Sequence, residues 1–310
     1  MCQKVHCGGF SDFQVFQARK AGSTSEARWH PCGGDEKLQK IENRSNQRAL
    51  AHDGTQQAYG HRSIVMRIIL IILFILFLCV TLLIPMLVLL VVRLFNKDAS
   101  EIISQHIARV VMKVVNFLAG AKVTVKGLEN VPKDEAVLFV PNHRGAIDYT
   151  ATVMSLPVPL YFVGKKEFVR IPLFGVWVYL QGTLLLDRSS RKEGLKTIFQ
   201  AIDMVKAGKS ILIFPEGTRN KGEITEPLRF KEGSLKISSK SGCKVVPMAI
   251  TGTREIFEAQ APWIKPGPVT VRFGTPIDPK TLSEEDIKNY GTYVREKIAE
   301  MLKEEVEENK

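Results

Sequence analysis

The sequence predicts an α/β protein with a mostly parallel or mixed sheet flanked by helices, preceded by a helical segment that anchors the chain to a membrane. Three observations predict this fold. After residue 120, short runs rich in β-branched and aromatic residues alternate with helical stretches. Residues 68–92 carry no charge, which is typical of a membrane segment. Several of the short runs end in polar turns, and ligands bind at the carboxyl ends of the strands in such sheets.

The pattern predicts the following elements after residue 96. Strands are expected at 122–127, 136–141, 160–165, 183–187, 210–215, 244–250 and 269–274. Helices are expected at 146–156, 166–180, 192–207, 232–241 and 283–307. Apolar residues at helical spacing also predict an amphipathic helix over 100–118 that lies on a membrane, and an ordinary core helix is the alternative.

The chain divides into three segments. Residues 1–65 are polar and lack periodicity, which predicts a disordered or non-native N-terminal extension, with Met66 as the natural start. Residues 66–118 are predicted to form membrane-associated helices. The uncharged run from Ile68 to Val92 is long enough to span a bilayer, or it enters one leaflet, with a kink at Pro85. Residues 119–310 form the remaining domain.

The charge balance limits the partners. The formal net charge is +11, from 43 basic and 32 acidic residues, which favours nucleic acid, a phosphorylated substrate or an acidic membrane surface. The sequence has no nucleic-acid-binding motif and has a membrane segment, so we expect no nucleic-acid partner. It also lacks the H-E-x-x-H metal motif and the G-x-S-x-G nucleophile elbow. We therefore expect no metal and no α/β-hydrolase chemistry.

The motif "NHRGAID" places His143 and Asp148 five residues apart, directly after the run "AVLFVP". Residues at this spacing do not face each other on a helix, so contact requires a turn. Gly145 is expected to make that turn with a positive φ. Asp148 would then accept the Nδ1 proton of the imidazole and leave Nε2 as a general base. Alternatively, Asp148 only favours the positive end of the helix and His143 is an ordinary loop residue.

Basic residues follow other predicted strands. The run "ILIFP" is followed by "EGTR", in which the guanidinium of Arg219 lies beside a hydroxyl and backbone N–H groups, as in a phosphate clamp. Arg188 follows "TLLLD", and Lys165 ends "LYFVGK". Each of these charges alone would be an ordinary surface charge. Their shared position at strand ends indicates an anion site.

These motifs resemble those of the glycerolipid acyltransferase family. "NHRGAID" is similar to its H-x-x-x-x-D block and "FPEGTR" to its second signature. "GTLLLDR" resembles the block between them and "VVPMAI" the fourth block, in the family's order. The segments "GKKEFVRIPLFG" and "PGPVTVRFGTPID" resemble the lysophosphatidate acyltransferase branch. The resemblance covers about residues 66–280 and makes 119–310 the acyltransferase domain.

The resemblance implies roles for individual residues. His143 would deprotonate the free glycerol hydroxyl and Asp148 would orient the imidazole, so that the alcohol attacks an acyl thioester directly, without a covalent acyl-enzyme. The substrate phosphate would be held by Arg188, Arg219 and Lys165. The acceptor site would be shaped by Glu216, Gly217 and Thr218, and Pro247 would lie near the acyl donor. Many members have serine in place of Gly145, so a supporting hydrogen bond from that hydroxyl is either absent in this chain or supplied elsewhere, by Thr150 or Tyr149.

The expected function is transfer of a fatty acyl group from an acyl thioester to the free hydroxyl of 1-acylglycerol 3-phosphate, giving phosphatidate. No cofactor is expected, because acyl-CoA or acyl-ACP is the donor substrate. The expected partners are lysophosphatidate, this donor and membrane lipids, with the catalytic domain on the cytoplasmic face of a membrane. The alternatives are an acyltransferase for another lysolipid, a thioesterase or lipase, and a non-catalytic membrane lipid-binding protein.

Overall fold

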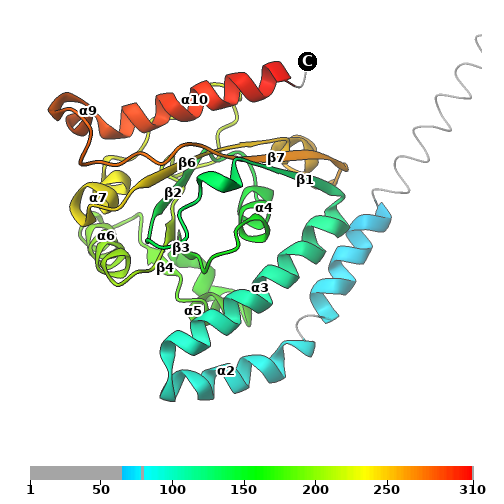
Figure 1. Cartoon of the computed structure of the whole chain (residues 1–310). Coiled ribbons are helices and arrows are strands. Elements are labelled where there is room, and N and C mark those ends of the chain that lie inside the picture. Colours follow the sequence, from blue (N-terminus) through cyan, green and yellow to red (C-terminus); the bar gives the residue numbers. More distant parts are fainter. Residues whose placement is uncertain (1–64, 78–79, 309–310) are drawn as a thin grey trace, which may run out of the picture. The chain divides into compact units, whose positions relative to one another are not determined.

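The computed structural model describes residues 65–77 and 80–308 (Figure 1). Residues 64–310 form one compact unit. The extension predicted for 1–65 lies outside the described residues, apart from Val65.

Seven strands form one mixed sheet in the order β1-β7-β6-β2-β5-β3-β4. Their bounds are β1 Ala121–Lys126, β2 Leu138–Pro141, β3 Tyr161–Lys165, β4 Leu184–Leu186, β5 Ile211–Leu212, β6 Val245–Thr251 and β7 Gly267–Phe273. Every neighbouring pair is parallel except β6 and β7, which are antiparallel. Each strand overlaps a predicted run, and the predicted mixed sheet is confirmed.

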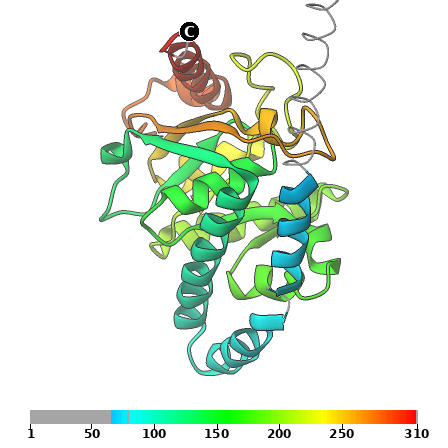
Figure 2. The same ribbon diagram turned by 90° about the vertical axis from the view of Figure 1, so that its right-hand side faces the viewer.

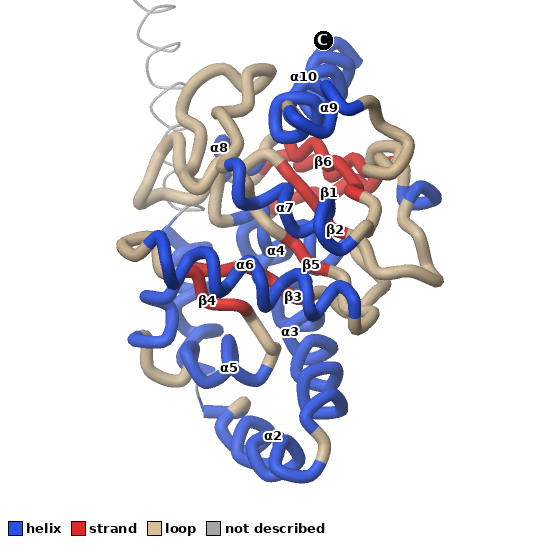
Figure 3. The backbone as a smooth tube through the Cα atoms, turned by 90° about the vertical axis from the view of Figure 1, so that its left-hand side faces the viewer, coloured by secondary structure: helices blue, strands red, loops and turns tan. Residues whose placement is uncertain are grey.

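Helices cover both faces of this sheet, and the central strands are therefore buried on both sides. Successive residues of β2 enter different cores. Leu138 packs in the core with α6 (Arg191–Lys206), α7 (Glu232–Ser241) and α10 (Tyr290–Glu308), and Figure 3 shows α6 and α7 in front of the strands. Phe139 packs in the opposite core with Ile147 of α4 (Ile147–Ser155).

Two predicted helices are each divided into two. The stretch 166–180 forms a 3-10 helix, η2 (Lys166–Arg170), followed by α5 (Phe174–Leu180). Pro172 has no N–H to donate and Leu173 has a φ of 60°, so the helix does not continue through them. The stretch 283–307 forms α9 (Glu284–Lys288) and α10, with Asn289 between them. Two short helices were not predicted, η1 (Leu128–Asn130) and α8 (Thr253–Ile256).

The uncharged run 68–92 is interrupted by a turn. The described residues of this run are helical over 65–77 and 80–81, Leu82 is a turn residue, and α2 spans Leu83–Phe95. Pro85 lies in the first turn of α2 and cannot donate a hydrogen bond to the carbonyl of Thr81, so the interruption at Leu82 lies where the kink predicted from Pro85 is expected. With 13 residues, α2 is about 20 Å long, shorter than a hydrocarbon core of roughly 30 Å. In the described part of the chain, only α3 (Lys97–Ala119) has the length and composition of a membrane-crossing helix.

In α3 the buried face is mostly polar and large apolar side chains are exposed, which is the opposite of an ordinary core helix. Its buried residues are mostly polar: the hydroxyl of Ser104 donates to the carbonyl of Leu180, and the amide of Gln105 donates to that of Gln181. Val110 and Phe117 are 62% and 78% exposed. The core-helix alternative is therefore wrong. In Figure 2, as in Figure 1, α2 lies at the end of this unit opposite α10.

Candidate active site

The carboxyl ends of four parallel strands meet at one edge of the sheet. β2, β5, β3 and β4 are consecutive in the sheet order, so the loops that follow them are neighbours. The loop after β2 carries His143, and the loop after β5 carries Arg219. These loops are joined directly, because the N–H of Asn220 donates to the carbonyl of His143 at 2.7 Å. The predicted clustering of the motifs is confirmed.

The predicted contact between His143 and Asp148 is present. Nδ1 of the imidazole lies 2.8 Å from Oδ2 of the carboxylate, which is fully buried. The same oxygen accepts hydrogen bonds from the N–H groups of Arg144 and Gly145 at 2.6 and 2.8 Å. The other oxygen accepts from the hydroxyl of Thr253 at 2.5 Å. The carboxylate is therefore fixed in position, and the Nδ1 contact orients the imidazole.

The turn between the two residues does not depend on a positive φ at Gly145, and that prediction is wrong. Gly145 lies outside the left-handed region. The loop instead wraps around the carboxylate of Asp148 through two backbone N–H groups. A Cβ there would lie 2.5 Å from Oε2 of Glu258, the end of a flexible side chain, so any larger residue at 145 requires Glu258 to move.

Neither Thr150 nor Tyr149 replaces the serine hydroxyl that is common at position 145 in the family. The single proton of the Thr150 hydroxyl is shared between the carbonyl of Ile147 and the side-chain oxygen of Asn116, each 3.0 Å away. The Tyr149 hydroxyl donates to Gln181 at 3.3 Å. Neither hydroxyl bonds the loop 142–145, so the alternative in which Thr150 or Tyr149 supplies this hydrogen bond is wrong.

The imidazole of His143 packs against an aromatic ring, and its Nε2 makes no hydrogen bond within the described chain. Its ring stacks on Phe214, with ring centroids 4.2 Å apart and planes at 29°. The edge of Phe162 in turn contacts Phe214, and Tyr149 packs against Phe162. Burial raises the pKa of Tyr149 to about 12, so its hydroxyl is neutral at pH 7. Nε2 of His143 has no hydrogen-bond partner in the described chain, and the side chain is 20% exposed.

Glu216 faces the protein interior, since only 2% of the residue is exposed. One oxygen of its carboxylate accepts from the N–H of His143 at 2.7 Å and the other from the N–H of Leu228 at 3.0 Å. Burial raises the pKa of Glu216, and these two hydrogen bonds oppose the shift. Through these two hydrogen bonds, the buried carboxylate of Glu216 links the backbone of His143 to that of Leu228. The adjacent Gly217 has a φ of +70°, which the tight turn requires.

The predicted phosphate-binding residues all lie at this edge of the sheet, and they differ in their exposure and in their contacts. The guanidinium of Arg188 donates to the carbonyl of Gly217, which ties the loop after β4 to the loop after β5. Arg219 is 49% exposed and lies 3.3 Å from a carboxylate oxygen of Glu258. Lys165 is exposed at the end of β3. Thr218 is also exposed, in the turn before Arg219.

Pro247 lies away from this cluster. It pairs with Val140 inside the sheet, whereas the side chain of Asn142, next to His143, bonds the backbone of Ile250 three residues further along β6. Pro247 lines a cavity of about 540 Å³ that contains none of the predicted site residues except itself. Its proximity to an acyl donor stays a prediction.

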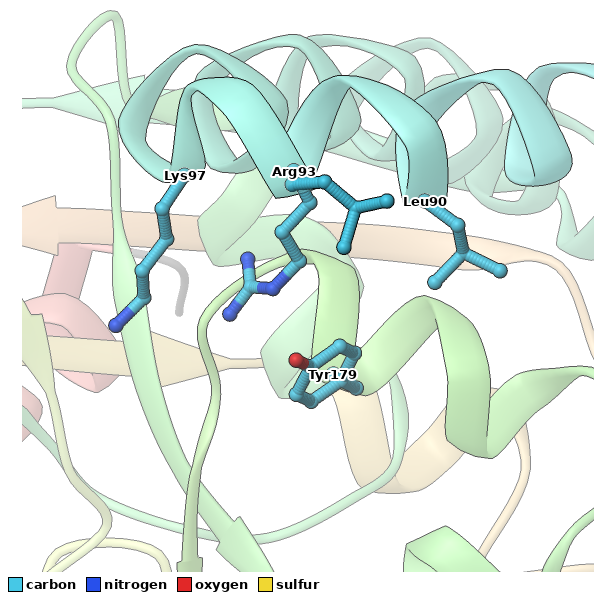
Figure 4. A pocket seen from close by; sticks show the side chains of 5 residues that line it. Leu90, Arg93, Lys97 and Tyr179 are labelled. Atoms are coloured by element: carbon cyan, nitrogen blue, oxygen red, sulfur yellow. The ribbon is translucent and has the colours of Figure 1, made fainter.

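A second cavity, of about 390 Å³, lies between α2 and α5 (Figure 4). It is lined by Leu90, Arg93, Leu94, Lys97 and Tyr179. None of these belongs to the edge that carries His143. Within residues 65–77 and 80–308, no group of three or more His, Cys, Asp and Glu side chains could hold a metal ion.

Sequence reasoning missed the residues that reach the loop from a distance. Thr253 lies 105 residues after Asp148, and Glu258 lies 112 residues after Ala146, whose N–H donates to it. Both follow β6, whose carboxyl end lies at the same edge because β6 is parallel to β2. The polar segment "TGTREIFE" after the run "VVPMAI" was the available signal. Phe214, which stacks on His143, is the first residue of the "FPEGTR" motif.

Comparisons with known proteins agree with this architecture. The family model described as Acyltransferase matches residues 122–251. The 1-acyl-sn-glycerol-3-phosphate acyltransferase of Borreliella burgdorferi is 31% identical over 63% of this chain and 77% of its own length. The enzyme of that name from Saccharomyces cerevisiae is 29% identical over 64% of this chain, which spans 65% of that relative.

A solved structure of an acyltransferase has a similar fold. The crystal structure of the 1-acyl-sn-glycerophosphate acyltransferase PlsC from Thermotoga maritima matches with a TM-score of 0.61 and 26% sequence identity. The match covers 77% of this chain and 97% of the other. With the Borreliella relative covered over more than two thirds of its length, the chain belongs to the 1-acyl-sn-glycerol-3-phosphate acyltransferase family.

Proposed function

We propose that this protein transfers a fatty acyl group from an acyl thioester to the free hydroxyl of 1-acylglycerol 3-phosphate, giving phosphatidate. The observation that carries the proposal is the imidazole of His143. Its Nδ1 contacts a buried carboxylate at 2.8 Å, and its Nε2 is unpartnered in the described chain, at a sheet edge that also bears Arg188 and Arg219. The names of the relatives support this choice of acceptor.

The proposed reaction needs one general base. Nε2 of His143 takes the proton of the acceptor hydroxyl while the oxygen attacks the thioester carbonyl. The tetrahedral intermediate then collapses, the carbon–sulfur bond breaks, and the leaving thiolate recovers a proton from the imidazolium. The buried Asp148 stabilises the imidazolium that exists between these two transfers. The atoms balance without a covalent acyl-enzyme.

The acceptor phosphate would bind at the basic end of the same edge. Arg219 has the exposure and the fork geometry for a phosphate, and Arg188 and Lys165 add positive charge from the neighbouring strands. Thr218 offers a hydroxyl in the same turn. Glu216 and Gly217 would shape the acceptor site indirectly, by fixing the loops that carry His143 and Arg219.

We further propose that the protein works at a membrane, with its catalytic domain on the cytoplasmic face. Apolar side chains stay exposed along α2, and α3 turns polar residues inward and apolar ones outward. Such helices gain free energy by burying that surface in lipid. Lys97, which lines the cavity in Figure 4 and has a side chain that is 66% exposed, would contact anionic headgroups. The cytoplasmic face follows from the location of acyl thioesters.

The donor is acyl-CoA or acyl-ACP, because both present the same thioester. An assay of the purified protein with lysophosphatidate and each labelled thioester tests the function, with products separated by lipid class. His143→Ala should lower turnover by about 10² to 10⁴, the usual contribution of a general base. His106→Ala is the matched control, because His106 is an exposed histidine on α3. Unchanged phosphatidate formation by His143→Ala would refute the general base.

The acceptor class is tested by Arg219→Ala. This change should weaken the binding of 1-acylglycerol 3-phosphate and leave the binding of an unphosphorylated monoacylglycerol unchanged. Only the phosphorylated acceptor carries a dianion for the guanidinium. Lys303→Ala removes an exposed positive charge from α10 and serves as the control. Equal losses on both acceptors would count against a phosphate clamp. Release of free fatty acid in place of phosphatidate would indicate a thioesterase, and binding of lysolipid without turnover a lipid-binding protein.

A further inference from the structure

The carboxylate of Glu258 lies where an anionic ligand of this site would be expected. One oxygen, Oε1, accepts from the N–H of Ala146 at 2.7 Å, just before the first turn of α4. The same oxygen lies 3.3 Å from the guanidinium of Arg219. A backbone N–H at a helix N-terminus and a guanidinium are the donors that bind phosphate in proteins. In the structure, both donors are taken by a side chain of the protein itself.

This carboxylate is only half satisfied. Its second oxygen, Oε2, is buried and has no hydrogen-bond partner, and the side chain is 14% exposed. A buried carboxylate oxygen without a donor costs free energy, so the contact of Glu258 is weaker than its geometry at Oε1 alone would give. A phosphate monoester carries up to two charges and three terminal oxygens, so it can bind the same donors more strongly.

The space for Glu258 depends on Gly145. A Cβ at that position would lie 2.5 Å from Oε2 and 3.1 Å from the carboxyl carbon of Glu258. The backbone of Gly145 itself has an ordinary φ, so a serine there would be strained by this contact alone. A side chain at position 145 therefore displaces the carboxylate of Glu258.

We propose that Glu258 is an internal competitor for the substrate phosphate: it holds Ala146 N–H and Arg219 in the free protein and is displaced when a phosphate monoester binds. The inference rests on the proposed function, because it takes Arg219 as the phosphate ligand. It adds a residue to which no role has been assigned. An acceptor without phosphate has no anion to replace the carboxylate, so the Glu258–Arg219 pair stays closed.

Calorimetric titration of the full chain in detergent with glycerol 3-phosphate tests the proposal. Glu258→Gln should tighten binding about tenfold, which corresponds to a competing contact present in about nine-tenths of the free molecules. Glu255→Gln is the matched control. It removes the same charge from an exposed residue three positions away, and no contact of its side chain with Arg219 is seen. The control should bind like the unaltered protein.

A second variant tests the steric part without changing the charge. Gly145→Ser should push Glu258 away from Arg219 and tighten glycerol 3-phosphate binding in the same direction. In the Glu258→Gln background it should add little, because the competitor is already weakened and the two changes act on one contact. Thermal unfolding of each variant verifies that it is folded.

The outcomes distinguish failure of the competitor proposal from failure of the proposed phosphate site at Arg219. If Arg219→Ala weakens glycerol 3-phosphate binding while Glu258→Gln and Gly145→Ser leave it unchanged or weaken it, Glu258 positions Arg219 and the competitor proposal is overturned. If Glu255→Gln tightens binding as much as Glu258→Gln, only general electrostatics is at work and the proposal is also overturned. If Arg219→Ala itself has no effect, the phosphate site is elsewhere and both proposals fail.

Discussion

Replacement of Asp148 by asparagine separates its charge from its structural role. The amide oxygen can take the place of Oδ2 and still accept from Nδ1 of His143 and from the N–H groups of Arg144 and Gly145. The amide nitrogen then faces the hydroxyl of Thr253, which can rotate to accept. All four contacts survive, so we expect the melting temperature to change little. Only the negative charge opposite the imidazolium is lost.

The expected kinetic effect follows from that charge. A hydrogen bond to a charged group contributes about 1.5–3 kcal/mol, and loss of about 2–3 kcal/mol of imidazolium stabilisation corresponds to a roughly 30- to 150-fold lower turnover. Asp148→Ala is the contrasting variant. It leaves two backbone N–H groups and the Thr253 hydroxyl without their acceptor and should destabilise the fold by several kcal/mol at about 1–3 kcal/mol for each group.

Initial rates of phosphatidate formation and thermal unfolding, measured on the same preparations, test both statements. Asparagine should give a folded but slow enzyme, and alanine an unstable one. If Asp148→Asn retains a rate within about threefold of the unaltered protein, the imidazolium does not need this charge and the reasoning is refuted. A large loss of thermal stability in Asp148→Asn would show instead that the amide is not accommodated.

Two further predictions concern the surrounding network. Thr253→Val should lower the free energy of unfolding by about 1–3 kcal/mol, because it leaves one buried oxygen of Asp148 without a donor; full stability of this variant in denaturant melts would contradict the prediction. Glu216 gives a pH dependence. Its pKa is raised by burial, so the folded protein binds this proton more tightly than the unfolded chain does, and stability is lost as the pH rises above the ordinary pKa of a glutamate. Unfolding followed from pH 4 upward should therefore show the unaltered protein losing stability relative to Glu216→Gln, and parallel curves would remove Glu216 as the cause.

Much of the fold could be predicted because its signals are local. A parallel strand buried on both faces needs a short continuous apolar run, and "AVLFVP" and "ILIFP" are such runs. The two divided helices show the limit of this reasoning. Pro172 was visible in the sequence, but the positive φ of Leu173 and the break at Asn289 were not predicted from it. The run 68–92 has the composition of one membrane helix, and composition does not record where a helix ends.

The candidate site was predictable only in part. His143, Asp148 and Arg219 lie in short motifs whose residue types and position after a strand indicate their chemistry. The partners Thr253 and Glu258, which fix the His143 loop, come from more than 100 residues away. Gly145 is the clearest example, since a positive φ was expected there, whereas the structure shows no positive φ and a carboxylate from residue 258 close to its Cα.

The sequence by itself determined which segments are strands, that His143 and Asp148 could meet across a turn, and that positive charge follows several strand ends. These depend on apolar runs, on turns and on residue type, all of which are local properties. Only the tertiary structure decided that β2 lies between β5 and β6, which brings Arg219 to one side of His143 and Thr253 to the other. Strand order depends on which faces pack together over the whole domain, and no stretch of sequence encodes that alone.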